Sequence, residues 1–206
     1  VDVLGVPVVT GMSSVDALES DHPYFVGRSG GTGTRPGNFA LQNSDVLLSI
    51  GNRQGFAQTG FQYQDWARES YTILNDIDEN ELKKPNLHVS LPVVGDAGEL
   101  IRGLLAEAKK RGADKGYPLF KGEDWRKQCL LWKKKYPIVT EKHYETLEEG
   151  CTNIYAFYGE LSKAMKENET LMVSVGTSRV AGSQAFQVKK GQRFITNPNT
   201  ASMGFC

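Results

Sequence analysis

The sequence contains no apolar run that approaches the ~20 residues needed to span a membrane. It also lacks an excess of either charge, because 24 Lys and Arg residues balance 24 Asp and Glu residues. We therefore expect neither a nucleic-acid nor a membrane partner. Hydrophobic residues make up 39% of the chain and charged residues 23%, which is typical of an ordinary globular protein.

Clusters of cysteine or histidine are missing as well. The three cysteines are odd in number and have neither disulfide nor metal-site spacing: Cys129, Cys151 and Cys206. We expect a reducing, cytoplasmic setting. The three histidines lie beside no obvious nucleophile: His22, His88 and His143. With no His-x-x-x-His or Cys-x-x-Cys pair either, no catalytic or metal-binding residue is assigned within this sequence.

Short apolar runs alternate with helix-like segments over the first hundred residues. The runs are nearly continuous, which is typical of strands covered on both faces in a parallel sheet. We expect strands at 6–10, 45–50, 71–75 and 88–94, and helices at 36–42, 80–84 and 96–111. The last helix carries one apolar stripe: Leu100, Ile101, Leu104, Leu105 and Ala108. The alternation predicts an α/β fold with a Rossmann-like parallel sheet and helices on both faces.

Three regions follow from this pattern. Residues 1–111 are predicted as a central domain, and 112–152 as a linker anchored by Trp125, Leu130, Leu131 and Trp132, with a solvated helix end at 133–135. Residues 153–206 are predicted as the first part of a second α/β domain, with a helix at 154–165 and strands at 171–175 and 194–196. Because the chain enters a strand within a few residues and stops just after a loop, we expect an excerpt of a longer polypeptide.

Ligands of open α/β sheets bind at the carboxyl ends of the strands. Here these ends carry glycines, an arginine and carboxylates, at 10–12, 51–53, 75–78 and 95–96. Such residues can bind a nucleotide, or they can serve only the turns between strand and helix, and the pattern leaves both open. The glycine-rich run 27–34 lacks the closing Lys-Ser/Thr of a P-loop, and no expected strand leads directly into it. By itself this run is interpreted as a flexible surface loop.

Several short motifs resemble, in order and spacing, the central domain of acetolactate synthase-type enzymes that depend on thiamine diphosphate. They comprise residues 6–10, 21–23, 27–34, 38–45, 51–53, 59–60, 76–78 and 95–96, and they are collinear over about residues 4–108. Residues 153–206 resemble the start of the diphosphate-binding domain of the same family. There, a strand ending at Val175 and Gly176 precedes a helix, and a loop of small residues leads to Met203.

The resemblance implies two ligand sites. A central-domain site for FAD or ADP would be lined by Thr10, Gly11, Met12, Gly30, Arg53, Asp76, Ile77, Gly95 and Asp96. Thiamine diphosphate would meet Gly176, Thr177 and Ser178 at its phosphates and Ala201, Ser202 and Met203 near its aminopyrimidine. The Mg²⁺-binding motif and the glutamate that activates the aminopyrimidine would lie outside this chain. The fragment alone is therefore expected to be inactive.

The resemblance also implies an activity, that of a transferase or lyase acting on a 2-oxo acid as a carboligase or decarboxylase, and assembly as a homodimer or homotetramer. Three segments depart from the family pattern. Thr177 and Ser178 replace a common Gln-His, residues 54–57 replace Phe-Asp-Asp-Arg, and residues 197–199 replace Ser-Gly-Gly. The central site is thus left open between FAD, ADP and no ligand. A non-catalytic nucleotide-binding or assembly module of the same fold remains the alternative.

Overall fold

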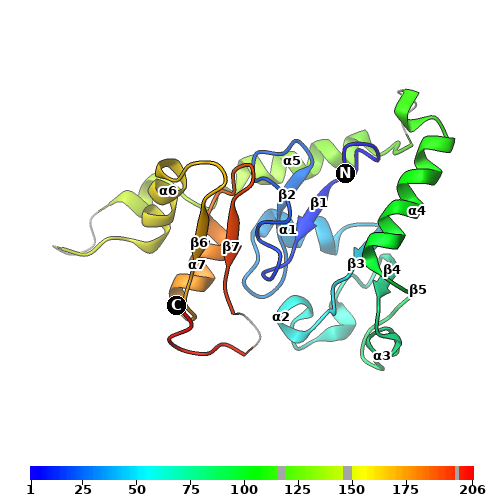
Figure 1. Cartoon of the computed structure of the whole chain (residues 1–206), viewed down its shortest axis with the longest axis horizontal. Helices are drawn as coiled ribbons and strands as arrows, with labels where there is room; N and C mark the ends of the chain where they lie inside the picture. The colour runs from blue at the N-terminus through cyan, green and yellow to red at the C-terminus, as the bar shows by residue number, and fades with distance from the viewer. Residues whose placement is uncertain (116–118, 146–149, 198–199) are drawn as a thin grey trace.

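The computed structural model describes residues 1–115, 119–145, 150–197 and 200–206. Three small sheets and the helices around them form the fold (Figure 1). The strands are β1 (Val8–Thr10), β2 (Phe25–Arg28), β3 (Val46–Ile50), β4 (Tyr71–Asp76), β5 (Leu91–Val94), β6 (Thr170–Met172) and β7 (Arg193–Ile195). The helices are α1 (Arg35–Gln42), α2 (Phe56–Thr59), α3 (Glu79–Leu82), α4 (Ala97–Lys110), α5 (Glu123–Lys135), α6 (Ile154–Ala164) and α7 (Thr177–Ala185).

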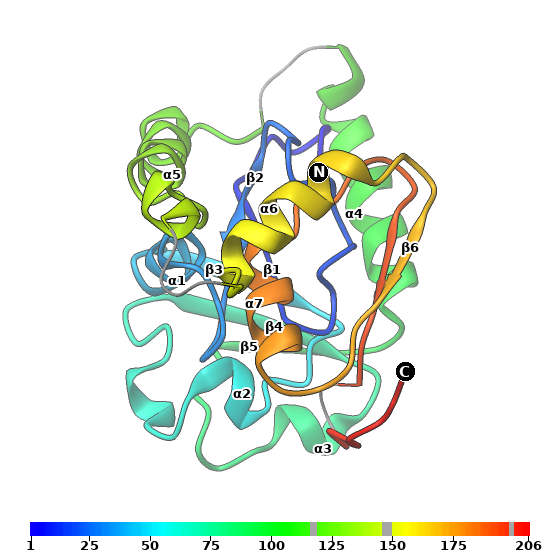
Figure 2. The ribbon, with the colours of Figure 1, turned by 90° about the vertical axis from the view of Figure 1, so that its left-hand side faces the viewer.

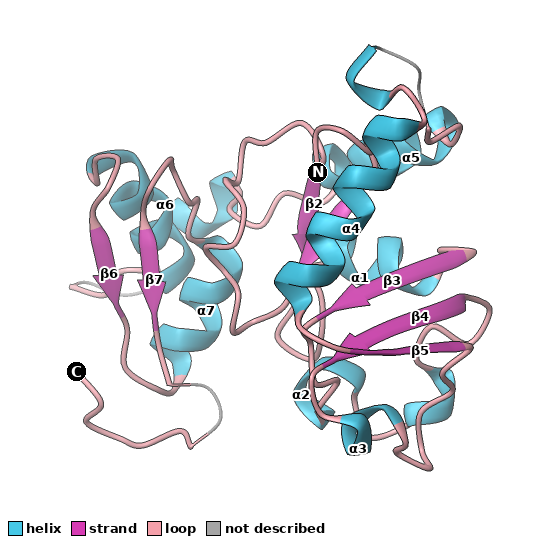
Figure 3. Cartoon of the chain, turned by 45° about the vertical axis from the view of Figure 1, so that its right-hand side comes forward, coloured by secondary structure: helices cyan, strands magenta, loops and turns pink. Residues whose placement is uncertain are grey.

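All strand pairs are parallel. β1 pairs with β2, the order β3-β4-β5 makes a second sheet, and β6 pairs with β7. Figure 3 shows β3, β4 and β5 running across the direction of β2. The predicted α/β class with parallel strands flanked by helices is confirmed, but the central strands form two hydrogen-bonded sheets rather than one.

Strand β2 was not predicted. It lies directly before the glycine-rich run, so the expectation that no strand leads into this run is wrong. The interpretation of the run as a flexible surface loop is wrong at its ends, where Gly27, Arg28, Ser29 and Thr34 are buried. A strand of four residues that contains a glycine is too short to show the apolar alternation on which the prediction relied.

The glycine-rich run lets β2 and α1 approach each other very closely. Thr34 is the N-cap of α1, and its hydroxyl accepts hydrogen bonds from the N–H of Gly37 and the N–H of Arg28. A Cβ atom added to Gly37 would lie 2.3 Å from the carbonyl oxygen of Arg28. Only glycine fits at this helix position, since atoms cannot approach so closely without displacing the backbone.

Helix α5 covers the outer side of α1. Cys129, at 0% exposure, packs with Val26 and Ala40, while Trp125 and Trp132 close the edge of this cluster. The two tryptophans thus act as the predicted anchors. Leu131 does not, because it is 54% exposed. Burial also raises the pKa of the Cys129 thiol to about 11, so this cysteine is a packing residue rather than a nucleophile.

The prediction of a solvated helix end at residues 133–135 is wrong for Lys133. Its ammonium donates hydrogen bonds to the carbonyl oxygens of Ser20, at 2.9 Å, and Phe25, at 2.8 Å. Desolvation lowers the pKa of this half-buried amine. Lys134 and Lys135 are exposed as expected.

The second α/β unit has its own core, around Tyr158, Ala185, Phe186 and Phe194. Val15, from the segment after β1, is part of this core at 1% exposure. The same segment donates from Ser20 N–H to the carbonyl of Val188. The two units are therefore joined through residues that lie far apart in the sequence. In the view of Figure 2, α6 and α7 lie in front of the strands of the first unit.

Part of the first unit is left uncovered. On α4, the predicted stripe is buried only at Ala108, while Ile101 and Leu105 are 51% and 38% exposed. On the β3-β4-β5 sheet, Val46 and Leu91 are likewise exposed, and they share a face because of the strand register. Within the described residues, no helix is long and apolar enough to cross a membrane.

The close approach of β2 to α1 can be tested with two glycines that both lie in helices. In the full polypeptide, we expect Gly37→Ala to lower the free energy of unfolding by more than ~2 kcal/mol, because its methyl group would collide with the Arg28 backbone. Gly103→Ala is the control, since its methyl group meets nothing within 4 Å; it should gain up to ~1 kcal/mol from helix propensity. Urea unfolding midpoints measure both, and equal midpoints for the two variants would contradict the packing described.

Candidate functional site

Thr10, which ends β1, Arg53, which follows β3, and Asp76, which ends β4, lie at the carboxyl ends of strands, as predicted. Gly30 also follows a strand, the unpredicted β2. A side chain at Gly11 would lie 3.2 Å from Gln58 Oε1 and 3.8 Å from Asn52 Nδ2. The ends of β1 and β2 therefore meet the segment that follows β3, although the two sheets are not hydrogen-bonded to each other.

Most charged groups at this edge are already engaged within the chain. Arg53 Nε donates to Glu81 at 2.8 Å, and the pKa of that carboxyl is lowered by Lys84 and Arg53. Asp96 caps α4 by accepting from the Glu99 N–H at 2.9 Å. Asp76 accepts from the Asp78 N–H at 3.0 Å, which closes a turn. These contacts match the purely structural role that the pattern had left open. Ile77 is 74% exposed.

The main-chain amides of the glycine-rich segment are also engaged. Gly30 N–H donates to Asn38 Oδ1, Gly31 N–H to the carbonyl of Ala57, and Thr34 N–H to the carbonyl of Arg28. A phosphate cradle needs such amides to point at the ligand. In this structure the segment is built to hold β1, β2 and α1 together, and its amides fit a dinucleotide phosphate poorly.

At the start of α7, in contrast, the main-chain amides are open to a ligand. Gly176 is its N-cap and has φ 94° and ψ −152°, a conformation that suits glycine, with nothing within 4 Å of an added Cβ. No side chain caps the helix, and Gly176 and Thr177 are exposed. The first amides of a helix have no partner within the helix, and the helix dipole adds partial positive charge there. The amides at the start of α7 can therefore bind the diphosphate group that the family resemblance implies for Gly176, Thr177 and Ser178.

The other three residues expected near thiamine diphosphate lie in the exposed C-terminal segment. Met203 is 92% exposed, and Ala201 has φ 50°. The described residues thus place Gly176, Thr177 and Ser178 together at one helix end but leave Met203 without a packed environment. Two of the three residues that replace Ser-Gly-Gly, at positions 198 and 199, fall outside the described residues.

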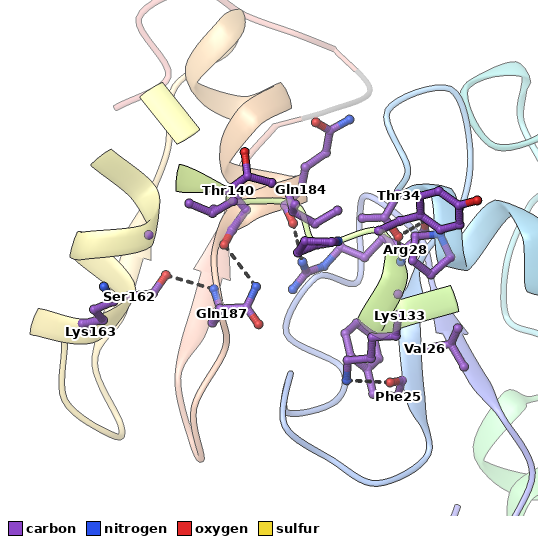
Figure 4. A pocket seen from close by; sticks show the side chains of 18 of the residues that line it. Phe25, Val26, Arg28, Thr34, Lys133, Thr140, Ser162, Lys163, Gln184 and Gln187 are labelled. Atoms are coloured by element: carbon purple, nitrogen blue, oxygen red, sulfur yellow. Dashed lines mark hydrogen bonds between the residues drawn. The ribbon is translucent and has the colours of Figure 1, made fainter. Parts of the chain in front are cut away.

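A cavity among the described residues lies away from the predicted site residues. It has a volume of about 730 Å³ and opens between β2, the end of α5, residues 137–141, α6 and the end of α7 (Figure 4). None of the predicted site residues lines it. Its walls contain four cationic side chains and two carboxylates: Arg28, Lys133, Lys163, Lys189, Glu141 and Glu160. Among the described residues, its lining includes no histidine, cysteine or aspartate.

Arg28 is the residue at this cavity that sequence reasoning missed. It is 3% exposed, and it donates from Nη1 to the carbonyl of Gln184 and from Nη2 to the carbonyl of Phe186. Burial lowers the pKa of the guanidinium to about 10, so it remains charged at neutral pH. Since its partners lie 156 and 158 residues away, no local motif could have indicated this role.

Metal binding is not supported by the described part of the chain, which holds no group of three or more His, Cys, Asp or Glu side chains suited to an ion. The expectation that this chain contributes no metal-ligating residue remains a prediction.

Comparisons with known proteins identify relatives of the chain. The family model described as "Thiamine pyrophosphate enzyme, central domain" matches residues 1–104. The chain is 28% identical over 214 residues to a probable acetolactate synthase large subunit of Methanocaldococcus jannaschii, covering 97% of this chain and 33% of that protein. It is 26% identical over 218 residues to the probable large subunit of Methanococcus aeolicus, covering 100% and 34%.

A third relative is the acetolactate synthase isozyme 2 large subunit of Escherichia coli K12, 26% identical over 202 residues, covering 97% of this chain and 33% of the relative. The chain therefore spans about a third of the length of these curated relatives. With half of its residues matched by this family model, the chain belongs to the thiamine pyrophosphate enzyme family, and the relatives named above are acetolactate synthase large subunits.

Proposed function

We propose that the complete polypeptide is a thiamine diphosphate- and Mg²⁺-dependent carboligase or decarboxylase of 2-oxo acids. The observation that carries the proposal is the start of α7, where an uncapped helix N-terminus follows β6 and an open glycine turn. A doubly charged phosphate group placed there would meet free amides and the positive end of the helix dipole.

The cofactor supplies the electron sink for loss of carbon dioxide from the 2-oxo acid and for transfer of the remaining fragment to an acceptor. The residues of this chain have binding and orienting roles. The amides of Thr177 and Ser178 hold the diphosphate, and the exposed Thr177 hydroxyl adds a donor where relatives commonly carry Gln-His. Ser178 is less free, because its hydroxyl donates to the carbonyl of Ser174 at 3.0 Å. Ala201, Ser202 and Met203 are proposed to close over the aminopyrimidine when the rest of the polypeptide is present.

Several further features belong to the proposal. The Mg²⁺ ligands lie in the part of the polypeptide beyond this chain, and the fragment alone is inactive. The protein works in the cytoplasm as a homodimer or homotetramer. FAD or ADP occupies the strand ends of the central domain only if the engaged groups there rearrange, because Arg53, Asp96 and the amide of Gly30 already have partners.

Two departures from the family pattern, Thr177-Ser178 and residues 54–57, favour a second candidate, a non-catalytic nucleotide-binding or assembly module that kept the fold and lost the chemistry. The two candidates differ in thiamine diphosphate binding. Calorimetric titration of the complete protein with thiamine diphosphate and Mg²⁺ separates them, because only the enzyme should bind at micromolar concentrations.

The activity can be tested directly on the full-length protein. With thiamine diphosphate, Mg²⁺ and pyruvate, we expect proton NMR to show acetolactate accumulating while pyruvate is consumed, because the chain aligns with acetolactate synthase large subunits over its whole length. A protein that binds the cofactor and leaves pyruvate untouched would point to another 2-oxo acid. A protein that neither binds the cofactor nor turns over any 2-oxo acid would contradict the proposal.

The role of the turn before α7 can be tested with two glycines of nearly the same backbone conformation. We expect Gly176→Ala to weaken thiamine diphosphate binding about tenfold, since alanine at φ 94° is strained by roughly 1–3 kcal/mol and relaxation would turn the first amides away. Gly60, with φ 81° and ψ −174°, caps the end of α2 and has equally open surroundings. Gly60→Ala should leave the dissociation constant unchanged, and equal effects of the two variants would argue against a diphosphate at α7.

A further inference from the structure

The guanidinium of Arg28 connects two parts of the molecule that are remote in sequence. It extends from the end of β2, packs near the ring of Phe25, and ends beside the last turn of α7. Its donors reach the carbonyls of Gln184 at 3.2 Å and Phe186 at 3.1 Å, with longer contacts of 3.5 Å to the Val15 carbonyl and Ser20 Oγ. Figure 4 shows Arg28 in contact with Gln184 among the residues that line the cavity.

All four partners of Arg28 are uncharged. Within the described residues, no carboxylate lies within ion-pair distance of the guanidinium, and its Nε has no hydrogen-bond partner. A buried cation normally needs a compensating negative charge. Here the compensation comes from the C-terminal end of α7. The Gln184 carbonyl is unpaired within the helix and lies at the negative end of its dipole, and Phe186 is the C-cap residue that follows the helix.

A second side chain fixes the same helix end. Gln184 Nε2 donates to the carbonyl of Gly33 at 3.3 Å, and its Oε1 accepts a hydrogen bond from the hydroxyl of Tyr155 at 2.6 Å. Three hydrogen bonds therefore join the end of α7 to β2 and the glycine-rich segment. The backbone of that segment is itself held rigidly against α1 by the contacts of Thr34.

The opposite end of α7 is the start that the proposed function assigns to the diphosphate. The helix has nine residues and is roughly 13 Å long, so it moves as a rigid rod. Its N-terminal end has no side-chain cap, and Arg179 in its first turn makes only a weak contact from Nη1 to Met12 Sδ at 3.3 Å, because a thioether is a poor acceptor. Its C-terminal end has the Arg28 and Gln184 hydrogen bonds. The position and tilt of the diphosphate-binding amides therefore depend on these C-terminal hydrogen bonds as well as on the packing of Ala181 and Ala185 in the core.

We propose that Arg28 is a positioning residue for the diphosphate of the cofactor: by holding the C-terminal carbonyls of α7, it orients the amides at the N-terminus of this helix. The inference rests on the proposed function. It assigns the glycine-rich segment a role in binding thiamine diphosphate through the helix, rather than in cradling a nucleotide phosphate directly.

The chain offers a matched control for this role. Lys133 is a half-buried cation that donates to two main-chain carbonyls and lies over the ring of Phe25, but neither of these carbonyls belongs to α7. Arg28→Met removes a buried cation with four uncharged partners, and Lys133→Met removes a half-buried cation with two. A loss of global stability should therefore appear in both variants and be larger in Arg28→Met, whereas a specific change at α7 should appear only in Arg28→Met.

The experiment uses the full-length protein and two measurements: the dissociation constant of thiamine diphosphate with Mg²⁺, and amide hydrogen exchange of α7 without cofactor. We expect Arg28→Met to weaken binding about tenfold and to speed exchange in residues 177–185. Lys133→Met should change neither, and Arg28→Lys, whose ammonium can reach one carbonyl, should weaken binding about threefold. If Arg28→Met does not fold, Arg28→Lys alone decides.

Wild-type affinity and unchanged α7 exchange in the Arg28 variants that fold would overturn the inference, as would equal effects in Arg28→Met and Lys133→Met. A wild-type protein that does not bind thiamine diphosphate is a different result, because it refutes the proposed function. Exchange that is faster in α7 of Arg28→Met would then still show that Arg28 fixes this helix but would refute its role for the cofactor.

Discussion

The contact of β2 with the start of α1 is the constraint on which most of this structure depends. Three glycines make it possible, because a Cβ at Gly27, Gly33 or Gly37 would fall within 2.6 Å of an atom of Arg28, Ser29 or Thr34. The tight turn fixes the direction in which the Arg28 side chain leaves the strand. From there the guanidinium reaches the end of α7. The close packing of glycines in the first unit therefore places a charged group where it can contact the second unit.

The glycine-rich segment has a different role from the glycine-rich loops that bind nucleotides. In phosphate-binding loops, glycine lets the ligand approach free amides. Here glycine lets strands and helices of the protein approach one another, and the main-chain amides of the segment donate hydrogen bonds within the protein. The free amides lie instead at α7, where the turn before the helix has open space and no competing side chain. We therefore propose that the cofactor-binding groups of this chain lie mainly in the second unit.

Much of the fold could be predicted from the sequence, and the failures have physical reasons. Strand β3 and helix α4 have clear apolar patterns and appear within a residue or two of where they were expected. Strand β2 is only four residues long, contains a glycine and precedes more glycines, so nothing local distinguishes it from a loop. The burial of Leu131 was wrongly expected because the apolar spacing of α5 does not reveal that Cys129 faces α1.

The candidate site, too, could be predicted from the sequence only in part. Parallel topology alone predicts that the strand ends share an edge, and Gly11 and Gly30 do lie close to the segment after β3. Whether the groups at that edge are free for a ligand depends on side-chain partners such as Glu81 for Arg53, which spacing cannot show. The roles of Arg28 and Lys133 depend on carbonyls that are more than a hundred residues away, and only the folded chain brings them together.

The central claim is that the start of α7 receives the diphosphate of the cofactor. Hydrogen exchange of the full-length protein, measured with Mg²⁺ plus either thiamine diphosphate or unphosphorylated thiamine, tests it most directly. The account predicts that thiamine diphosphate slows exchange in residues 177–180 and that thiamine at the same concentration does not. Unchanged exchange in this segment at saturating thiamine diphosphate would contradict the claim.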